Sequence, residues 1–478
     1  MQAYCDLPVI HPWRRGKQGW IGAKLRVFHM IGTVRSLFGL LLCSVFFSSS
    51  WGESADHGYR LLVDKAYLPA DFDQETFDQV WQVWPEPLRS KAYKATVAER
   101  RKLAFERYGL SQRPGERAGK PLQYVVSDDG QWSMNCFSCH GGRVNGVVTP
   151  GAPNTDFRLA TMTAEIRLTK LKASKQLTRM DVGSLFMPLG SNTGTTNAVM
   201  FGVALMAYRQ PDLSFSGRRL PPPMVHHDMD APPWWNIYRK EKLYIDGFAP
   251  SGPRPLMQFM LVEENGPEKF REWESDFEHV YSYIQSLRAP EYPDRIDQVL
   301  AKQGQVAFRR ACAECHGSYG EAVDYPERTI PLDEIGTDPV RLRALTSVHR
   351  KGYGESWFGH FGTKTVEHDP VGYVAPPLDG IWASSPYLHN GAIPTLWHLL
   401  HPEERPVVWR RSAQQLDFSR VGLHVDEFEQ VPEIGRSATD RREFFDTRRI
   451  GKSASGHEFV NRLSDSEKHA VLEYLKTL

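Results

Sequence analysis

Two five-residue stretches decide how this sequence is read: Cys136-Phe137-Ser138-Cys139-His140 and Cys312-Ala313-Glu314-Cys315-His316. Each follows the pattern Cys-x-x-Cys-His, which is the attachment signature of c-type haem. The spacing has a chemical reason, because two thiols add to the two vinyl groups of one porphyrin and the adjacent histidine is held beneath the iron. The sequence therefore predicts two covalent haems, attached through four cysteines and ligated by two histidines: Cys136, Cys139, Cys312, Cys315, His140 and His316.

Two other uses of these cysteines are alternatives to haem attachment. The chain has six cysteines, and four of them make up the two motifs. Two Cys-x-x-Cys pairs can hold a structural zinc ion, but zinc does not require a histidine directly after each pair. A disulfide within each pair would close almost no loop and would therefore stabilise the fold little. Haem attachment is the interpretation that uses every residue of both motifs.

Composition and charge place the chain among ordinary globular proteins. Of its 478 residues, 41% are hydrophobic and 24% are charged, and the formal net charge is +1. A near-zero charge gives no support to a nucleic-acid partner, since no basic excess is available to neutralise phosphates. At about 150 residues per domain, the length allows two or three domains.

The N-terminus has the pattern of an export signal. Six basic residues and one acid lie in residues 1–35, and an apolar run follows from Leu37 to Phe47, then three serines. A positive flank, a short apolar core and small residues are typical of a secretory signal. The apolar run is too short to span the ~30 Å hydrocarbon layer comfortably. Residues 1–55 are therefore predicted to be a signal peptide, with an N-terminal anchor as the alternative, and the mature chain is expected in the periplasm.

Two similar helices are predicted to close the two halves of the chain. Residues 271–287 have apolar side chains at helical spacing and end before Pro290. Residues 464–478 open with the capping-box residues Ser464 and Glu467. The helices end in similar pentapeptides, Tyr-Ile-Gln-Ser-Leu and Tyr-Leu-Lys-Thr-Leu. We predict a mainly α fold of two cytochrome c-like haem domains with long loops, over residues 56–289 and 290–478.

Two such motifs on one exported chain resemble the bacterial di-haem cytochrome c peroxidase superfamily. That group includes the di-haem enzyme that matures methylamine dehydrogenase and the di-haem rubber oxygenases. Most of residues 120–478 is similar to the rubber-oxygenase-like branch, through five stretches: Asn135–Asn154 (NCFSCHGGRVNGVVTPGAPN), Ala231–Trp235 (APPWW), Cys315–Gly320 (CHGSYG), Ile335–Pro339 (IGTDP) and Pro376–Leu396 (PPLDGIWASSPYLHNGAIPTL). The resemblance also allows a calcium ion between the two domains.

The sixth ligand of each iron decides what the iron can do, because a strong protein ligand favours electron transfer and an open position admits a small molecule. No methionine follows Cys315, which removes the methionine ligand common in peroxidases of this superfamily. Nine histidines follow His316. The preferred ligand is His457, since the rubber-oxygenase-like branch suggests a histidine near the C-terminus, with His401 and His398 as alternatives.

The first haem is predicted to be the reactive one. No histidine lies between His140 and His226, so we expect a five-coordinate or water-bound iron. The superfamily places a tryptophan between its two haems, and the resemblance assigns this relay to Trp234 or Trp235, with Trp235 preferred. Packing of both rings in the core is the alternative.

Further candidates follow from the chemistry of peroxide. Proton transfer needs an acid–base group, for which Glu263 and Glu264 beside an apolar stretch are candidates, and Arg254 is a candidate for stabilising negative charge. Solvated side chains are the alternative for all three. The stretch around His389 resembles a segment of the superfamily that approaches the haem, so His389 is expected to contact a haem propionate or the domain interface.

Together these observations predict a peroxidase-like, exported di-haem c-type cytochrome oxidoreductase. The second haem takes electrons from a small redox protein, a cytochrome or cupredoxin, and the first reduces peroxide or activates dioxygen. Two alternatives stay open. One is a di-haem oxygenase or protein-modifying oxidase, and the other is a non-enzymatic electron-transfer cytochrome with both irons six-coordinate.

Overall fold

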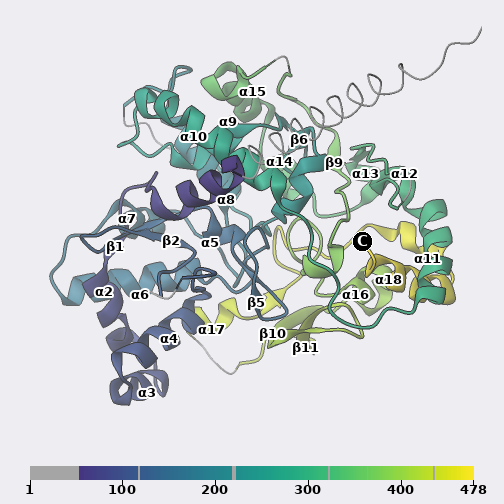
Figure 1. The fold of residues 1–478 in the computed structure, drawn as a ribbon, viewed down its shortest axis with the longest axis horizontal. Coiled ribbons are helices and arrows are strands. Elements are labelled where there is room, and N and C mark those ends of the chain that lie inside the picture. The colour runs from purple at the N-terminus through teal and green to yellow at the C-terminus, as the bar shows by residue number, and fades with distance from the viewer. Residues whose placement is uncertain (1–52, 117–118, 218–221, 321–322, 363, 434–436) are drawn as a thin grey trace, which may run out of the picture. The chain divides into compact units, whose positions relative to one another are not determined.

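The computed structural model describes residues 53–116, 119–217, 222–320, 323–362, 364–433 and 437–478 (Figure 1). Apart from its last three residues, the predicted signal segment 1–55 lies outside this part. Residues 54–478 form one compact unit. Within the described residues, no helix is both long and apolar enough to cross a membrane.

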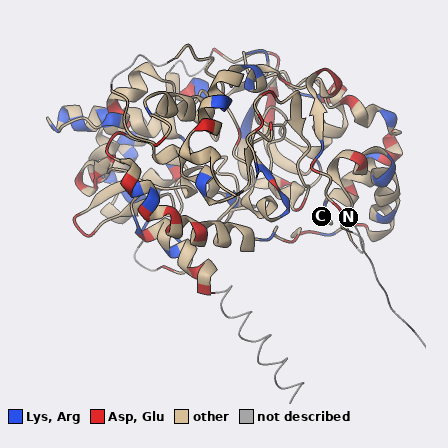
Figure 2. Cartoon of the chain, turned by 90° about the horizontal axis from the view of Figure 1, so that it is seen from above, with Lys and Arg blue, Asp and Glu red and all other residues tan. Residues whose placement is uncertain are grey.

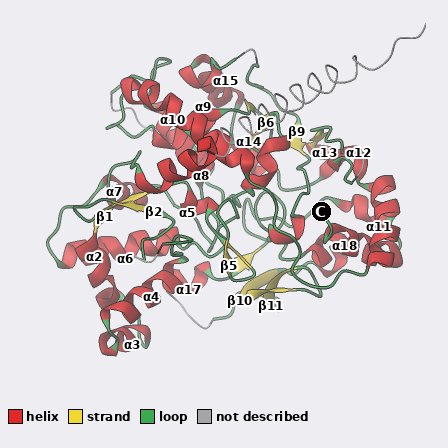
Figure 3. Ribbon diagram, in the orientation of Figure 1, coloured by secondary structure: helices red, strands yellow, loops and turns green. Residues whose placement is uncertain are grey.

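The fold is mainly helical, as predicted, and long loops join most of the helices (Figure 3). A first helical segment covers residues 54–64. The labelled α-helices that follow are α2 (Gln74–Gln79), α3 (Leu88–Lys94), α4 (Val97–Tyr108), α5 (Phe137–His140), α6 (Leu159–Lys172), α7 (Arg179–Phe186), α8 (Ala198–Ala207), α9 (Pro253–Leu256), α10 (Pro267–Ser286), α11 (Gln298–Ala311), α12 (Ala313–His316), α13 (Leu332–Ile335), α14 (Val340–Ala344), α15 (Ser347–Glu355), α16 (Leu396–Leu400), α17 (Ala438–Arg442) and α18 (Asp465–Leu475).

The strands form small antiparallel sheets. Two sheets have three strands, in the orders β1-β3-β2 and β11-β10-β12, and the pairs β4-β5, β6-β7 and β8-β9 stand alone. The strands are β1 (Phe72–Asp73), β2 (Tyr124–Val126), β3 (Gln131–Met134), β4 (Arg143–Val144), β5 (Val147–Val148), β6 (Lys242–Leu243), β7 (Ala249–Pro250), β8 (Thr329–Pro331), β9 (Gly372–Val374), β10 (Val408–Asp417), β11 (Gly422–Phe428) and β12 (Phe445–Asp446).

Both predicted closing helices are present, as α10 and α18. The capping box of α18 forms as expected: the Ser464 side chain accepts from the Glu467 backbone N–H, and the Glu467 carboxylate accepts from the Ser464 N–H at 2.9 Å. Such a box satisfies two of the N–H groups that a helix start leaves unpaired. Helix α18 packs against α11, which leads directly into the second Cys-x-x-Cys-His motif (Figure 1).

A glycine allows α11 and α18 to touch. A Cβ atom at Gly304 would overlap the Ala470 carbonyl oxygen and lie 2.9 Å from the Tyr474 Cβ. Phe308, one turn further along α11, packs against Tyr474 with ring centroids 5.2 Å apart. The backbones therefore approach as closely as packing permits, and any side chain at Gly304 would push them apart.

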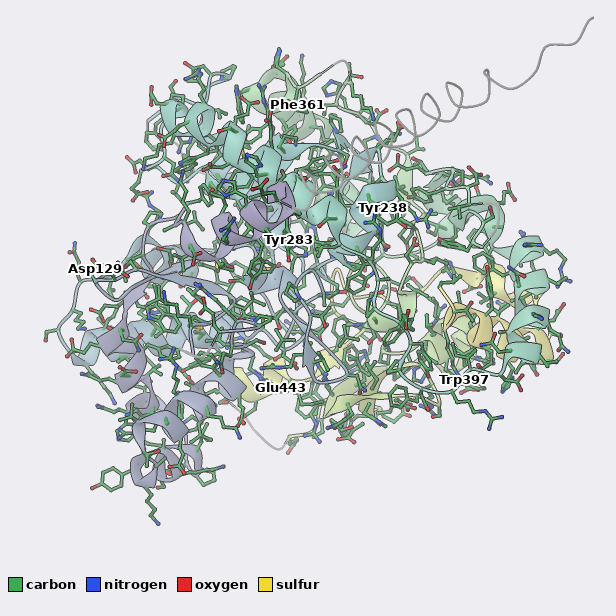
Figure 4. All side chains as sticks on the ribbon, in the orientation of Figure 1. Asp129, Tyr238, Tyr283, Phe361, Trp397 and Glu443 are labelled. Carbon is green, nitrogen blue, oxygen red and sulfur yellow. The ribbon has the colours of Figure 1, made fainter. Side chains whose placement is uncertain are left out.

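The first half repeats this contact. A Cβ atom at Gly58 would overlap the His279 carbonyl oxygen of α10 and lie 2.8 Å from the Cβ of Tyr283, which Figure 4 labels. Tyr283 and Tyr474 are the residues that begin the two similar pentapeptides. In the second half the haem motif follows α11 at once, whereas residues 65–135 separate the helical segment of Gly58 from the first motif. The weak sequence repeat thus corresponds to one packing arrangement used twice.

The hydrophobic cores extend across the predicted division at residues 289 and 290. One cluster built mainly from the first half includes Leu345 and Phe358, and the cluster built mainly from the second half includes Val144 and Trp235. The two-domain division stays a prediction, and in the structure the two halves share buried surface.

Replacing Gly304 by alanine is expected to lower the free energy of unfolding by about 1–3 kcal/mol, because the added methyl group overlaps α18. Gly352 in α15 is the matched control, since a Cβ there meets nothing within 4 Å. Gly352→Ala should be neutral or stabilise by up to ~1 kcal/mol through helix propensity. Chemical denaturation measures both, and equal effects would contradict the close approach of the two helices.

Candidate haem site

Both Cys-x-x-Cys-His motifs line one cavity of about 1650 Å³. Cavities for one small ligand are usually about 300–1,000 Å³, so this one has room for more than one large group. Four histidines lie among the described residues that line it: His140, His316, His389 and His457.

His140 is fixed in one tautomer. It ends the short helix α5, which follows strand β3, and its Nδ1 donates to the Pro232 carbonyl oxygen at 3.0 Å. A ring that donates from Nδ1 and stays neutral presents the Nε2 lone pair. Burial lowers the pKa of His140 to about 4, which keeps the ring neutral near pH 7. His140 therefore has the state that a metal ligand requires.

His316 repeats this arrangement in the second half. Its Nδ1 donates to the Pro376 carbonyl oxygen at 2.9 Å, and burial lowers its pKa. The two acceptors belong to the same tripeptide, Ala-Pro-Pro, at residues 231–233 and 375–377. Proline suits this role because it has no N–H of its own and a fixed φ. Both predicted iron ligands are thus oriented by the same kind of hydrogen bond, to a proline carbonyl oxygen of an Ala-Pro-Pro tripeptide.

The four described cysteines are free thiols. Burial raises the pKa of Cys136 to about 11 and the pKa values of Cys139 and Cys312 to about 12. Among the described residues, no three His, Cys, Asp or Glu side chains gather closely enough to hold a metal ion. The zinc alternative and the calcium expectation therefore gain no support.

His457 faces His316 across the cavity. Their ring centroids are 6.1 Å apart. Two metal–nitrogen bonds of ~2.0 Å each, plus the two ring radii, need a separation of about 6.3 Å. The observed separation is close to that value, and the Nδ1 of His457 has no hydrogen-bond partner. The residue that sequence reasoning preferred lies opposite the second motif's histidine.

The backbone at His457 is held in an unusual conformation. Its φ of 55° lies in the left-handed region, which non-glycine residues seldom adopt. Its N–H donates to the Ile335 carbonyl oxygen at 2.7 Å. Arg405 binds the preceding loop, donating to the carbonyl oxygens of Ala454 at 2.6 Å and Gly456 at 2.8 Å. Burial lowers the pKa of His457 to about 3, so its ring is neutral.

The two alternative ligands lie elsewhere. His401 stacks on Trp397 with ring centroids 3.8 Å apart and donates from Nδ1 to the Trp397 carbonyl oxygen. His398 is buried beside Thr395, with Glu427 at 3.4 Å. Neither is among the described residues that line the cavity.

Trp234 contacts the first motif directly. Its indole stacks on the His140 ring, with centroids 4.8 Å apart and planes at 24°. It is buried, and it follows the Ala-Pro-Pro tripeptide that binds His140. An oxidisable ring therefore lies against a predicted axial ligand.

Trp235 and Asn236 continue toward the second motif. The indole N–H of Trp235 donates to the Asp379 carbonyl oxygen at 2.8 Å, and the Asn236 side chain donates to the Pro377 carbonyl oxygen at 2.9 Å. Pro377 directly follows the residue that accepts from His316. Tyr238, labelled in Figure 4, donates to the Asp379 carboxylate at 3.1 Å. Residues 232–238 thus connect the surroundings of His140 with those of His316.

The two acid–base candidates and Arg254, the candidate for stabilising negative charge, do not lie around a common point. Glu263 and Glu264 line the cavity but are half-exposed, and both accept from the Arg179 guanidinium at 3.0 Å. Arg254 is absent from the described cavity lining; its guanidinium binds Glu274 at 2.6 Å and stacks on Trp357. Their catalytic roles stay predictions, and the geometry adds nothing to the role proposed for Arg254.

His389 lies in the cavity wall between the two motifs. Its ring packs on Tyr373 with centroids 4.5 Å apart, and its carbonyl oxygen accepts from Asp230. Burial, with a contribution from Arg341, lowers its pKa to about 3. It is placed where a group bound in the cavity would contact it.

Comparison with known proteins agrees with this geometry. Residues 372–410 match the family described as RoxA-like, cytochrome c-like. The chain carries a cytochrome c-like domain. A domain of this kind implies covalently bound haem. The match includes Pro376, His389 and Arg405, and it lies between the second motif and His457.

Two relatives from Sinorhizobium fredii share part of the chain. The uncharacterized protein y4iM is 31% identical over 208 residues, which are 37% of this chain and 45% of that protein. The uncharacterized protein y4iJ is 28% identical over 259 residues, which are 40% of this chain and 41% of that protein. The matches span less than half the length of either relative.

Sequence reasoning missed the residues that position the histidines. The carbonyl oxygens of Pro232 and Pro376 had a detectable signal, since Ala-Pro-Pro occurs once after each haem motif. Arg405 had no such signal, because its partners, the carbonyls of residues 454 and 456, are distant in sequence and bear no side-chain pattern.

His389→Phe should make stability less sensitive to acid. With a folded pKa of about 3 against 6.5 in the unfolded chain, the histidine takes up its proton only on unfolding between these values. The unfolding free energy therefore falls as pH drops from 6.5 to 3, by up to about 1.4 kcal/mol per pH unit from this residue. Denaturation at pH 7 and pH 5 measures the difference. The exposed His368→Phe is the control, and an unchanged slope in His389→Phe would contradict its burial as a neutral ring.

Proposed function

We propose that this protein is an exported, periplasmic di-haem c-type cytochrome oxidoreductase that reduces peroxide or activates dioxygen. One observation supports it above the rest: two histidines fixed as neutral ligands share one cavity, and one of them has a second histidine across from it. The two haems would differ in ligation, and different ligation gives different chemistry.

Four cysteines and two histidines would hold the cofactors, in the two motifs already described. When bound, haem supplies the electron storage and the activation of an oxygen species. His457 would close the second iron, which suits electron transfer. On the first side, Trp234 stacks on the His140 ring, and the first iron would stay open to an incoming small molecule.

The segment from Pro232 to Asn236 would carry electrons between the two centres. Trp234 stacks on His140, and Trp235 hydrogen-bonds to the segment that binds His316. The protein's own part is therefore to fix both rings, to hold an oxidisable pair between them, and to give one centre access. A small cytochrome or cupredoxin would deliver the electrons, and dioxygen activation is the second candidate, on the resemblance of the sequence to the rubber-oxygenase-like branch.

Mass and spectrum test the proposal directly. The mature protein should carry two covalent haem increments, and its oxidised EPR spectrum should contain one low-spin and one high-spin signal. A mass without two increments would end the di-haem proposal. A wholly low-spin spectrum would mean that a cavity side chain, such as a methionine thioether, closes the first iron and that the protein is an electron carrier.

His457→Ala tests the second ligand. The variant should convert the low-spin signal to high spin while both haems remain attached, since the thioether bonds do not involve His457. His401→Ala is the matched control, because its ring lies outside the described cavity lining, and it should leave the spectrum unchanged. Survival of the low-spin signal in His457→Ala would show that another side chain is the ligand.

Trp234→Phe and Trp235→Phe test whether the two tryptophans carry electrons between the haems. Each should slow electron transfer from the second haem to the first in stopped-flow reduction, because phenylalanine is far harder to oxidise than tryptophan. The buried Trp382→Phe controls for loss of an indole from the same core cluster as Trp235. Equal rates in all three variants would assign the tryptophan pair to packing alone.

A further inference from the structure

Three polar groups in the cavity wall lack partners. The Thr337 hydroxyl and the Arg341 Nε are buried without a hydrogen bond, and their residues are 4% and 1% exposed. The Lys240 ammonium has no hydrogen bond or ion pair within the described part of the chain. All three residues line the haem cavity. Leaving a buried donor unpaired is costly, so the two buried groups, with the half-buried Lys240 ammonium beside them in the cavity lining, indicate an acceptor that binds there.

In this wall, one buried carboxylate binds more than one cation. Asp246 is fully buried, and it receives Arg341 at 3.0 Å and Arg350 at 2.6 Å, so two guanidinium groups share one carboxylate. Asp246 and Glu327 attract Lys240 without contacting it, and the Glu327 carboxylate is bonded to two backbone N–H groups. Burial lowers the pKa of Lys240. An unpaired cation in a cavity wall is costly unless an anion meets it there.

Two of the three groups lie beside the second haem's expected place. Thr337 lies two residues after Ile335, whose carbonyl oxygen accepts from the N–H of His457, and a Cβ at Gly456 would overlap Gly336 and Thr337. Arg341 is close enough to His389 to lower the pKa of that ring, and Tyr373, which packs on His389, accepts at its hydroxyl from the backbone N–H of Leu342. Lys240 is linked to this group through Asp246, which attracts Lys240 and binds Arg341.

We propose that Lys240, Thr337 and Arg341 form a carboxylate-binding site that takes the carboxylate groups of the second haem. A carboxylate supplies several acceptor positions and one negative charge, which matches an ammonium, a guanidinium N–H and a hydroxyl. Charge-assisted hydrogen bonds of this kind are about twice as strong as neutral ones. The inference rests on the proposed function, because it needs a haem in the second position.

The site also predicts an effect on redox behaviour. A cation beside a haem carboxylate offsets its negative charge, which favours the reduced, less positive iron. Removing the cation should therefore lower the reduction potential of that haem and leave the other haem unaffected.

Lys240→Met is the test, and Lys242→Met is the matched control, since Lys242 is exposed two residues further along. Both variants should keep two haem increments by mass, because covalent attachment does not involve either lysine. Spectroelectrochemical titration without substrate should show a lowered midpoint for one haem in Lys240→Met only. Resonance Raman spectra should show a shifted carboxylate bending mode in the same variant.

Thr337→Val is a second variant of nearly the same shape, and it should shift the same midpoint in the same direction by less. Unchanged midpoint potentials in both Lys240→Met and Thr337→Val, with two haems present, would overturn the proposed carboxylate-binding site but not the proposed function. A change confined to the KM of an acidic substrate would assign the carboxylate to that substrate and would likewise overturn it. Absence of the second haem increment from the wild-type mass would instead overturn the proposed function.

Discussion

The arrangement of the candidate haem site depends on two hydrogen bonds. One runs from His140 to the Pro232 carbonyl oxygen, and the other from His316 to the Pro376 carbonyl oxygen. Each fixes a tautomer and an orientation at once, because the acceptor cannot donate and the proton must stay on Nδ1. Each also ties a haem motif to a segment far away in the sequence. These bonds therefore help to define the direction in which the Nε2 atoms point.

The two segments that contain these proline acceptors are hydrogen-bonded to each other. Residues 234–236 follow one acceptor, and they hydrogen-bond to residues 377 and 379, which follow the other. The Arg239–Asp379 ion pair at 2.6 Å secures this meeting from the outer side. The positioning of one histidine is therefore mechanically linked to that of the other, and this linkage explains why the hydrophobic cores do not separate at the predicted domain boundary.

The sequence allowed some features to be predicted because their causes are local. The Cys-x-x-Cys-His motifs, the capping box at Ser464 and the mainly helical fold all depend on neighbouring residues. Arg254 shows why other features were beyond reach. Its guanidinium is bound by Glu274 and by the carbonyls of Trp357 and His360, and only the folded chain brings that loop to it. Figure 2 shows that basic and acidic residues are intermixed along the chain. The charge of an arginine therefore does not identify the residue that it binds.

The asymmetry between the two halves has a structural origin. In the second half, α11 leads straight into the haem motif, and the chain returns through Gly456 and His457 to place a ring opposite His316. In the first half, residues 65–135 separate the glycine contact from the motif, and apolar side chains such as Phe201, Leu205 and Met260 line the cavity there. One packing arrangement, used twice with different loops, thus places the His457 ring beside His316, while the ring that stacks on His140 is that of Trp234. The proposed division of roles between the two centres depends on this difference.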